Sequence, residues 1–120
     1  MSGIEVDELS ARLEDPTLTV VDVRALSEFD GSGGAPCDAR QGHIPGARHV
    51  DLTALLECAT VEDVHALLDL PPGAEIAAYC HSGARSGVAV QILSAAGYEA
   101  RNYAGSWHEW SRRPDLPLGT

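Results

Sequence analysis

Two short apolar runs constrain the fold of this chain more than any other feature. They are TLTVVDVR at 17–24 and EIAAYC at 75–80, and both are apolar without interruption at their centres. Such runs are typical of strands covered on both sides, as in a parallel sheet. Segments with helical patterns alternate with the strands, and right-handed crossover helices are the usual connection between parallel strands. We therefore predict an α/β fold with a central parallel sheet and helices on both faces.

The rest of the chain fits this alternation. Apolar spacing predicts helices over 5–14, 61–70 and 88–97. Two further short strands are expected at 47–50 and 99–104. No internal repeat or linker interrupts the pattern, and 120 residues suit one domain. We therefore treat residues 1–120 as a single domain.

The second helix has the clearest start signal. Thr60 is a good N-terminal cap, and Asp63 follows three residues later, close to a capping-box pattern. The apolar face of this helix is expected to comprise Val61, Val64, Leu67 and Leu68. In contrast, residues 30–41 are rich in Gly, Asp and Pro and are predicted to form a surface loop.

The charge of the chain excludes several classes of function. All eight basic residues are arginines against 18 acidic residues, for a net charge of −10. Without lysine, neither a Schiff-base mechanism nor a Walker-type phosphate loop is possible. Repulsion from phosphates also argues against nucleic acid and anionic membranes as partners. The charge is uneven, because residues 79–120 contain three acids and four arginines, a net +1.

The sequence also suggests a compartment. It contains no apolar run of about 18 residues, so no membrane span is expected. The N-terminal MSGIEVDELS is acidic and lacks the apolar core of a secretory signal. Three cysteines without a CxxC spacing argue against a disulfide scaffold and against a zinc site. We therefore expect a cytoplasmic protein with free thiols and no metal.

One of these thiols occupies a position suited to chemistry. Cys80 ends the second predicted strand, and ligands in parallel sheets bind beyond the carboxyl ends of strands. Gly83 permits a positive φ, so successive N–H groups can turn inward around an anion. The following helix and Arg85 add positive potential. These effects favour the thiolate, so we expect Cys80 to be a nucleophile and the pKa of its thiol to be lowered. The candidate site loop is His81, Ser82, Gly83, Ala84, Arg85 and Ser86.

With these residues in place, the chain resembles the rhodanese-homology domains, a family of sulfurtransferases. Four segments carry the resemblance: VVDVRALSEF at 20–29, GHIPGARHVDL at 42–52, YCHSGARS at 79–86 and YAGSWHEWSRRPDLP at 103–117. The third resembles the common Cys-x-Ser-Gly-x-Arg-Ser loop of the family. The fourth resembles the C-terminal signature of the catalytic half of two-domain thiosulfate sulfurtransferases.

The resemblance implies a rhodanese-like fold and a reaction at Cys80. In such a reaction Cys80 takes a sulfane sulfur from a donor such as thiosulfate and becomes a persulfide. The sulfur then passes to cyanide or a thiol, including a thiol of an acceptor protein. Backbone N–H groups of residues 81–86 would stabilise the persulfide anion. No metal or organic cofactor is implied.

The resemblance also suggests supporting residues. Asp22 and Arg24 are expected to brace the edge of the active site. Arg85 is expected to pair with Glu28 or Asp22, to contact substrate, or both. Glu28 lies near the position of a substrate-binding arginine in many two-domain enzymes. This departure disfavours anionic donors such as mercaptopyruvate and weakens the assignment of thiosulfate as the physiological donor.

Further side chains are expected near the loop. Trp107 is predicted to pack beside it as a wall, together with Trp110. His81 either stabilises a departing sulfite or faces solvent. Cys37 is either a bystander or a resolving thiol for Cys80, and Cys58 is expected in the core or on a helix.

Two other functions use the same residues. The related phosphatases and arsenate reductases of this fold have a longer active-site loop, with five residues between the cysteine and the arginine. Here that later position is Ser86, and the shorter loop forms a narrower bowl that suits one sulfur atom. A non-catalytic relay or regulatory module is the other alternative, but such modules usually lack the cysteine.

Overall fold

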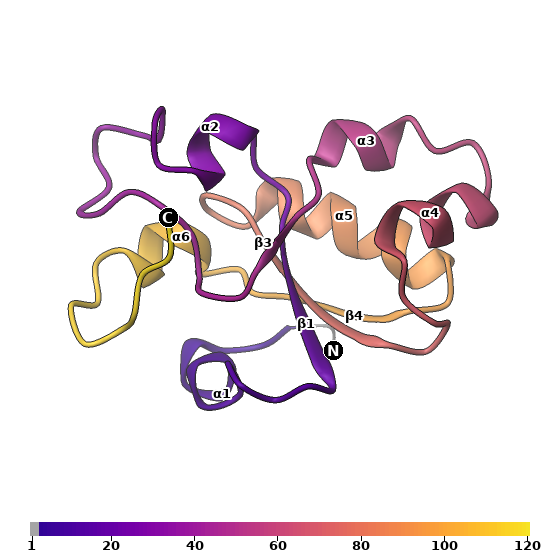
Figure 1. Cartoon of the computed structure of the whole chain (residues 1–120), viewed down its shortest axis with the longest axis horizontal. Coiled ribbons are helices and arrows are strands. Elements are labelled where there is room, and N and C mark those ends of the chain that lie inside the picture. Colours follow the sequence, from indigo (N-terminus) through magenta and orange to yellow (C-terminus); the bar gives the residue numbers. More distant parts are fainter. Residues whose placement is uncertain (1–2) are drawn as a thin grey trace.

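One sheet of four parallel strands forms the centre of the protein (Figure 1). A computed structural model describes residues 3–120. The strands are β1 (Leu18–Asp22), β2 (Arg48–His49), β3 (Glu75–Tyr79) and β4 (Glu99–Asn102). Their order across the sheet is β2-β1-β3-β4, so the two apolar runs of the sequence lie side by side at its centre. The predicted α/β fold with a central parallel sheet is confirmed.

Helices cover both faces of this sheet, as predicted. They are α1 (Val6–Ala11), α2 (Leu26–Phe29), α3 (Leu52–Leu56), α4 (Val61–Leu68), α5 (Ala84–Ala95) and α6 (Ser106–Trp110). In Figure 1, α3, α4 and α5 lie on one side of the sheet, and α1 and α6 lie on the other. Within residues 3–120, no helix has the length and apolarity needed to cross a membrane.

The two-sided covering explains why the centres of β1 and β3 are apolar on both faces. In and after β3, the side chains of Ile76, Ala78 and Cys80 join the core under α3, α4 and α5. Ala77 and Tyr79 point the other way, into the core shared with α1 and α6. Because successive strand residues face opposite sides, each residue from Ile76 to Tyr79 is buried by one layer or the other.

Helix α4 confirms its predicted cap but not its whole predicted apolar face. The hydroxyl of Thr60 accepts a hydrogen bond from the N–H of Asp63 at 3.1 Å, and the Asp63 carboxylate accepts the Thr60 N–H at 3.2 Å. Val61 and Leu67, predicted to face the core, remain 42% and 39% exposed. The helix packs through a narrower stripe, formed by the buried Val64 and Leu68.

Three other elements differ from the prediction. Helix α5 begins at Ala84, four residues before the predicted start. Its first turn is polar because those residues belong to the Cys80 loop and not to the core. Helices α2 and α3 were not predicted, since each is too short to show a helical period.

A buried ion pair lies at the end of β1. The side chains of Asp22 and Arg24 are fully buried, and Arg24 Nη2 lies 2.7 Å from Asp22 Oδ2. Arg24 Nη2 also donates to the carbonyl of Gly42 at 2.6 Å. Its guanidinium lies over the rings of Tyr79 and Trp107, 5.6 and 5.2 Å from their centroids. The pair therefore ties β1 to β3, to α6 and to the loop before β2.

We expect Asp22→Asn to destabilise the protein strongly. The substitution keeps the shape of the side chain but leaves the buried Arg24 without a counterion. Because removing one partner of a buried ion pair costs about 3–5 kcal/mol, the free energy of unfolding should fall by about 3 kcal/mol. Urea denaturation followed by tryptophan fluorescence measures this change.

Asp7→Asn is the matched control for this prediction. Asp7 is exposed on α1, so its substitution should change the free energy of unfolding by less than about 0.5 kcal/mol. Equal effects of the two substitutions would show that the buried pair has no special role in stability.

Candidate active site

Cys80 follows β3 directly and is held by backbone contacts from the C-terminal part of the chain. The residue is 1% exposed. Its N–H donates to the hydroxyl of Ser106 at 3.1 Å, and its carbonyl accepts the N–H of Trp107 at 3.0 Å. The start of α6 therefore fixes the backbone on both sides of the Cys80 side chain.

The loop after Cys80 turns donors toward the sulfur. The N–H of Gly83 donates to Cys80 Sγ at 3.1 Å, and the Ser86 hydroxyl lies 3.4 Å from the same atom. Gly83 has φ +101°, and a Cβ at this position would lie 2.8 Å from the carbonyl oxygen of Ala104. Only glycine fits here, for both conformational and steric reasons. The predicted positive φ at Gly83 is confirmed.

These donors determine the acidity of the thiol. Burial raises the pKa of Cys80, because it removes the thiolate from water. Hydrogen bonds from the Ser86 hydroxyl and from the N–H groups of Ser86, Gly83 and Ser82 act in the opposite direction and outweigh it. The pKa of Cys80 is therefore lowered below its ordinary value, as the loop pattern predicts. The site favours a thiolate, which is the nucleophilic form of cysteine.

The Ser86 hydroxyl has two possible acceptors and one hydrogen. It lies 2.7 Å from Asn102 Oδ1 and 3.4 Å from Cys80 Sγ. The shorter contact holds the hydrogen when the cysteine is a neutral thiol, and the charged sulfur competes for it when the thiolate forms. Asn102 also donates to the carbonyl of Gly83 at 3.2 Å. Asn102 therefore supports the loop, and no signal in the sequence pointed to it.

Arg85 pairs with Glu28 and not with Asp22. Its two terminal nitrogens lie 2.9 and 3.1 Å from the two carboxylate oxygens of Glu28. Burial raises the pKa of Glu28, but the hydrogen bonds from Arg85 and from the N–H of Ala25 lower it by a larger amount. The net pKa is lowered, so the carboxylate stays ionised. Of the two partners left open by the sequence, the structure selects Glu28. The guanidinium of Arg85 is thus already neutralised.

The remaining loop side chains point in different directions. Ser82 and Ala84 are exposed, so their contribution comes from the backbone. His81 is only partly exposed, and its Nε2 donates to Asp38 Oδ1 at 2.9 Å. The ring of His108 lies edge-on to the ring of His81, with centroids 5.5 Å apart. The 30–41 loop therefore contacts the Cys80 loop through Asp38, which sequence reasoning missed.

Trp107 and Trp110, which were predicted to pack beside the loop, are both fully buried. The indole N–H of Trp107 donates to the carbonyl of Arg40 at 2.9 Å. Its backbone N–H donates to the carbonyl of Cys80, and its ring packs against the Arg24 guanidinium. Ser106, which the sequence left without a role, has φ +56°, and its hydroxyl lies 3.9 Å from Cys80 Sγ. Its contact with the backbone of Cys80 exists only because α6 folds against β3.

The other cysteines are not bonded to each other or to Cys80. Cys37 is exposed, Cys58 is half-buried, and all three thiols of the chain are free. The thiol of Cys58 donates to the carbonyl of Ala54 at 3.4 Å, which fits its expected place near the core. A shallow groove of about 260 Å³ borders Cys58, but it lies at the C-terminal end of α5, away from the Cys80 loop.

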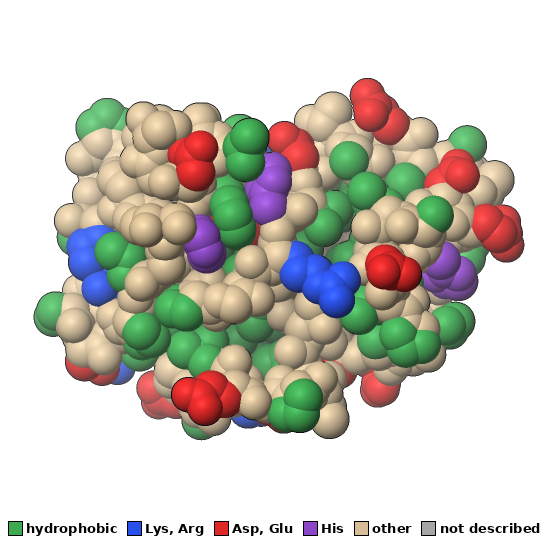
Figure 2. Space-filling model, viewed as in Figure 1, with side chains coloured by type: hydrophobic (Ala, Val, Ile, Leu, Met, Phe, Trp, Pro, Cys, Tyr) green, Lys and Arg blue, Asp and Glu red, His purple; other side chains and the backbone are tan. Residues whose placement is uncertain are grey.

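The electrostatic setting of the site differs from that of the surface. On the face in Figure 2, acidic side chains are scattered widely and basic ones are few, in line with the net charge of −10. With Arg85 paired to Glu28, positive potential at Cys80 comes mainly from backbone N–H groups and from the start of α5. Such a site suits a single small anionic ligand better than a large anionic partner.

The sheet, the buried cysteine and its N–H-lined loop define a class of α/β domain with an anion-stabilising thiolate site. A family model described as Rhodanese-like domain matches residues 5–113 of this chain. The chain belongs to the rhodanese-like domain family, which confirms the resemblance found in its motifs.

Individual relatives agree with this assignment. The chain is 34% identical over 118 residues to a thiosulfate sulfurtransferase of Pseudomonas aeruginosa, across 92% of this chain and 43% of the relative. It is 38% identical to a probable 3-mercaptopyruvate sulfurtransferase of the same organism, across 98% of this chain and 44% of the relative. The chain thus spans less than half the length of these curated relatives.

Solved structures share the fold. The crystal structure of a probable thiosulfate sulfurtransferase superposes with a TM-score of 0.85 at 40% identity, covering 99% of this chain and 48% of that one. An anaerobic ergothioneine biosynthesis enzyme from Chlorobium limicola superposes with a TM-score of 0.85 at 19% identity, covering 98% of this chain and 27% of that one. The latter similarity concerns the fold alone.

We expect Ser86→Ala to raise the pKa of Cys80. The variant loses a hydroxyl that stabilises the thiolate, whereas the N–H of the residue remains. The fraction of thiolate at neutral pH should fall, so alkylation of Cys80 by iodoacetamide should shift to higher pH. Peptide mass spectrometry after timed alkylation measures this shift.

Ser82→Ala is the matched control for this measurement. Ser82 acts on the sulfur through its backbone N–H, which alanine keeps, so the pH profile of alkylation should not move. An unchanged profile in Ser86→Ala would contradict the role of the hydroxyl.

Proposed function

We propose that this domain is a sulfurtransferase that carries a sulfane sulfur on Cys80. The observation that supports it most is the N–H of Gly83 at 3.1 Å from Cys80 Sγ, in a loop that favours the thiolate. Membership of the rhodanese-like family and the names of the relatives point to the same chemistry. We propose thiosulfate as the donor, and other anions that carry a sulfane sulfur belong to the same class of donor.

The first half-reaction charges the cysteine. The Cys80 thiolate attacks the outer sulfur of thiosulfate, a sulfur–sulfur bond forms, and the bond to the sulfonate sulfur breaks. Sulfite leaves with the electron pair of that bond, and Cys80 becomes a persulfide anion. No proton or external oxidant is required. Backbone N–H groups of the loop, which face Sγ in the resting site, stabilise the negative charge on the new terminal sulfur.

The second half-reaction returns the cysteine to its resting state. An acceptor nucleophile, cyanide or a thiolate, attacks the terminal sulfur of the persulfide. The bond between the two sulfurs breaks, and the Cys80 thiolate leaves with the electron pair. The products are thiocyanate or a new persulfide on the acceptor, which we propose to be a small thiol or a cysteine of a partner protein. Neither half-reaction uses a metal or an organic cofactor.

The supporting residues position the loop in this proposal. Asp22 and Arg24 hold the end of β1 beneath the site, and Trp107 holds the backbone of Cys80. Arg85 forms an ion pair with Glu28. Its guanidinium therefore positions the loop and is not free to bind a tetrahedral oxyanion. That pairing, together with the short loop, disfavours phosphatase and arsenate reductase chemistry.

We also propose a setting for the domain. The family match at 5–113 and the single sheet support one rhodanese-like domain across residues 1–120. The three cysteines are all unpaired in the structure, which suits a reducing compartment such as the cytoplasm.

Mass spectrometry of the intact protein tests the function directly. After incubation with thiosulfate the wild-type chain should gain one sulfur atom, and cyanide should remove it. Cys80→Ser should gain no sulfur, whereas Cys58→Ser should gain it as the wild type does. The proposal fails if the wild-type protein stays unmodified or if the adduct persists in Cys80→Ser.

Glu28→Gln should improve the use of an anionic donor. The variant removes the charge that neutralises Arg85 but keeps an oxygen for the N–H of Ala25. For a partly exposed pair worth roughly 1 kcal/mol, the KM for thiosulfate should fall about five-fold. Steady-state kinetics with cyanide as the acceptor measures this.

Glu62→Gln controls for the change in net charge. Glu62 is exposed in the first turn of α4, so its loss should affect KM only through long-range repulsion. An equal fall in KM for both variants would contradict a specific role of Glu28.

A further inference from the structure

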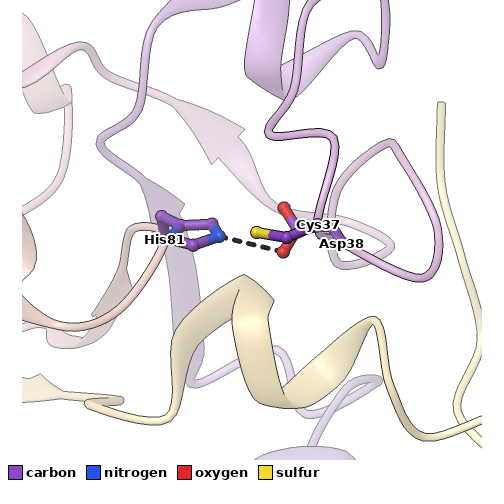
Figure 3. A group of neighbouring side chains, drawn as sticks. All are labelled: Cys37, Asp38 and His81. Carbon is purple, nitrogen blue, oxygen red and sulfur yellow. Dashed lines mark hydrogen bonds and ion pairs between the residues drawn. The ribbon is translucent and has the colours of Figure 1, made fainter.

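Three side chains with metal-binding atoms meet beside the Cys80 loop (Figure 3). Cys37 and Asp38 come from the 30–41 loop, and His81 comes from the residue after Cys80. The Cys37 sulfur, a carboxylate oxygen of Asp38 and a ring nitrogen of His81 all lie within 4.8 Å of one another. Figure 3 shows the sulfur lying between the imidazole ring and the carboxylate. The tertiary structure thus gathers a thiol, a carboxyl and an imidazole from segments far apart in the sequence.

The carboxylate of Asp38 is the strongest sign that something is to be bound here. Its side chain has no exposed surface. Oδ1 accepts the hydrogen bond from His81 Nε2 at 2.9 Å, whereas Oδ2 has no hydrogen-bond partner among residues 3–120. Burying an unpaired carboxylate oxygen is unfavourable, so an oxygen in this position is expected to have a partner. A cation beside Asp38 would supply one.

The donor set selects the type of ion. We propose that Cys37, Asp38 and His81 form a binding site for Zn²⁺. Zinc accepts thiolate, imidazole and carboxylate ligands, whereas Mg²⁺ and Ca²⁺ prefer oxygen alone. Tetrahedral zinc with ordinary bond lengths places its ligand atoms about 3.3–3.6 Å apart. Atoms that already lie within 4.8 Å reach this spacing with small side-chain movements.

Binding replaces contacts that the cluster makes without metal. The Cys37 thiol loses its proton, and His81 Nε2 exchanges the hydrogen that it shares with Asp38 for a bond to zinc. The ring then carries its hydrogen on Nδ1. Three protein ligands leave the fourth position of the ion for water or a small sulfur anion.

The location of this site gives the ion a regulatory role. His81 is bonded directly to Cys80 in the chain, so zinc held by His81 restrains the loop whose N–H groups face the sulfur. On the proposed sulfurtransferase function, zinc should therefore lower the rate of sulfur transfer. The inference that zinc binds does not depend on that function.

Cobalt is the probe that tests the site, because Co²⁺ substitutes for zinc and reports its ligands by absorption. The wild-type protein titrated with Co²⁺ should show a thiolate-to-cobalt charge-transfer band together with tetrahedral d–d bands, and Zn²⁺ should displace both. Cys37→Ser should lose the charge-transfer band and bind at least about tenfold more weakly. Because Cys37 is exposed, the thermal unfolding temperature of this variant should be unchanged.

Two controls identify the thiol. Cys58→Ser should keep the full spectrum, and so should Cys80→Ser, because neither cysteine belongs to the cluster. The proposal is overturned if Cys37→Ser keeps the charge-transfer band, if Cys80→Ser loses it, or if the wild-type protein shows no such band.

The activity measurement is separate from the spectrum. Zinc should reduce sulfur transfer in the wild type and in Cys58→Ser, and Cys37→Ser should resist it. If no sulfur transfer is found at all, the proposed function fails while the cobalt spectrum still decides the metal site. If zinc inhibits Cys37→Ser as strongly as the wild type, the regulatory role is wrong.

Discussion

The buried ion pair between Asp22 and Arg24 supports the edge of the sheet where the site lies. Arg24 gathers its contacts from the loop before β2, from β3 and from α6, all at the carboxyl ends of the strands. A guanidinium has donors in a planar fork and an apolar face for stacking, so one side chain can bond two segments and pack on two rings. The cost of burying this charge is offset by Asp22, two residues away in the sequence.

The position of Cys80 depends on this support. Its backbone is fixed by Ser106 and Trp107, and its sulfur is faced by the loop that Gly83 allows to turn. The pKa of the thiol is lowered by the Ser86 hydroxyl and by the N–H groups of Ser86, Gly83 and Ser82. The backbone donors are held in place by the fold, so they need no reorganisation when charge appears on sulfur. The pairing of Arg85 with Glu28 removes the most obvious positive charge from the site. A chain with a net charge of −10 can thus still stabilise an anion at one buried point.

Much of the fold followed from local patterns. The apolar strands at 17–24 and 75–80, the cap at Thr60 and the glycine-containing loop after Cys80 all depend on a few neighbouring residues, so they could be predicted from sequence. Elements too short to show a period, such as α2 and α3, could not. The choice of Glu28 over Asp22 as the partner of Arg85 also needed coordinates, because it depends on where α2 packs.

The sheet, the family and the candidate nucleophile could be predicted from the amino-acid sequence, because apolar patterns and contiguous motifs encode them. The distant side chains that surround this nucleophile became known only from the folded chain. Ser106 and Asn102 reach the Cys80 loop from later in the chain, and Asp38 reaches it from the 30–41 loop. Such contacts have no fixed spacing in the sequence, since they follow from how loops pack at the end of the sheet. The ligands of the proposed zinc site are also brought together by loop packing. The spacing of the cysteines in the sequence therefore argued against a zinc site.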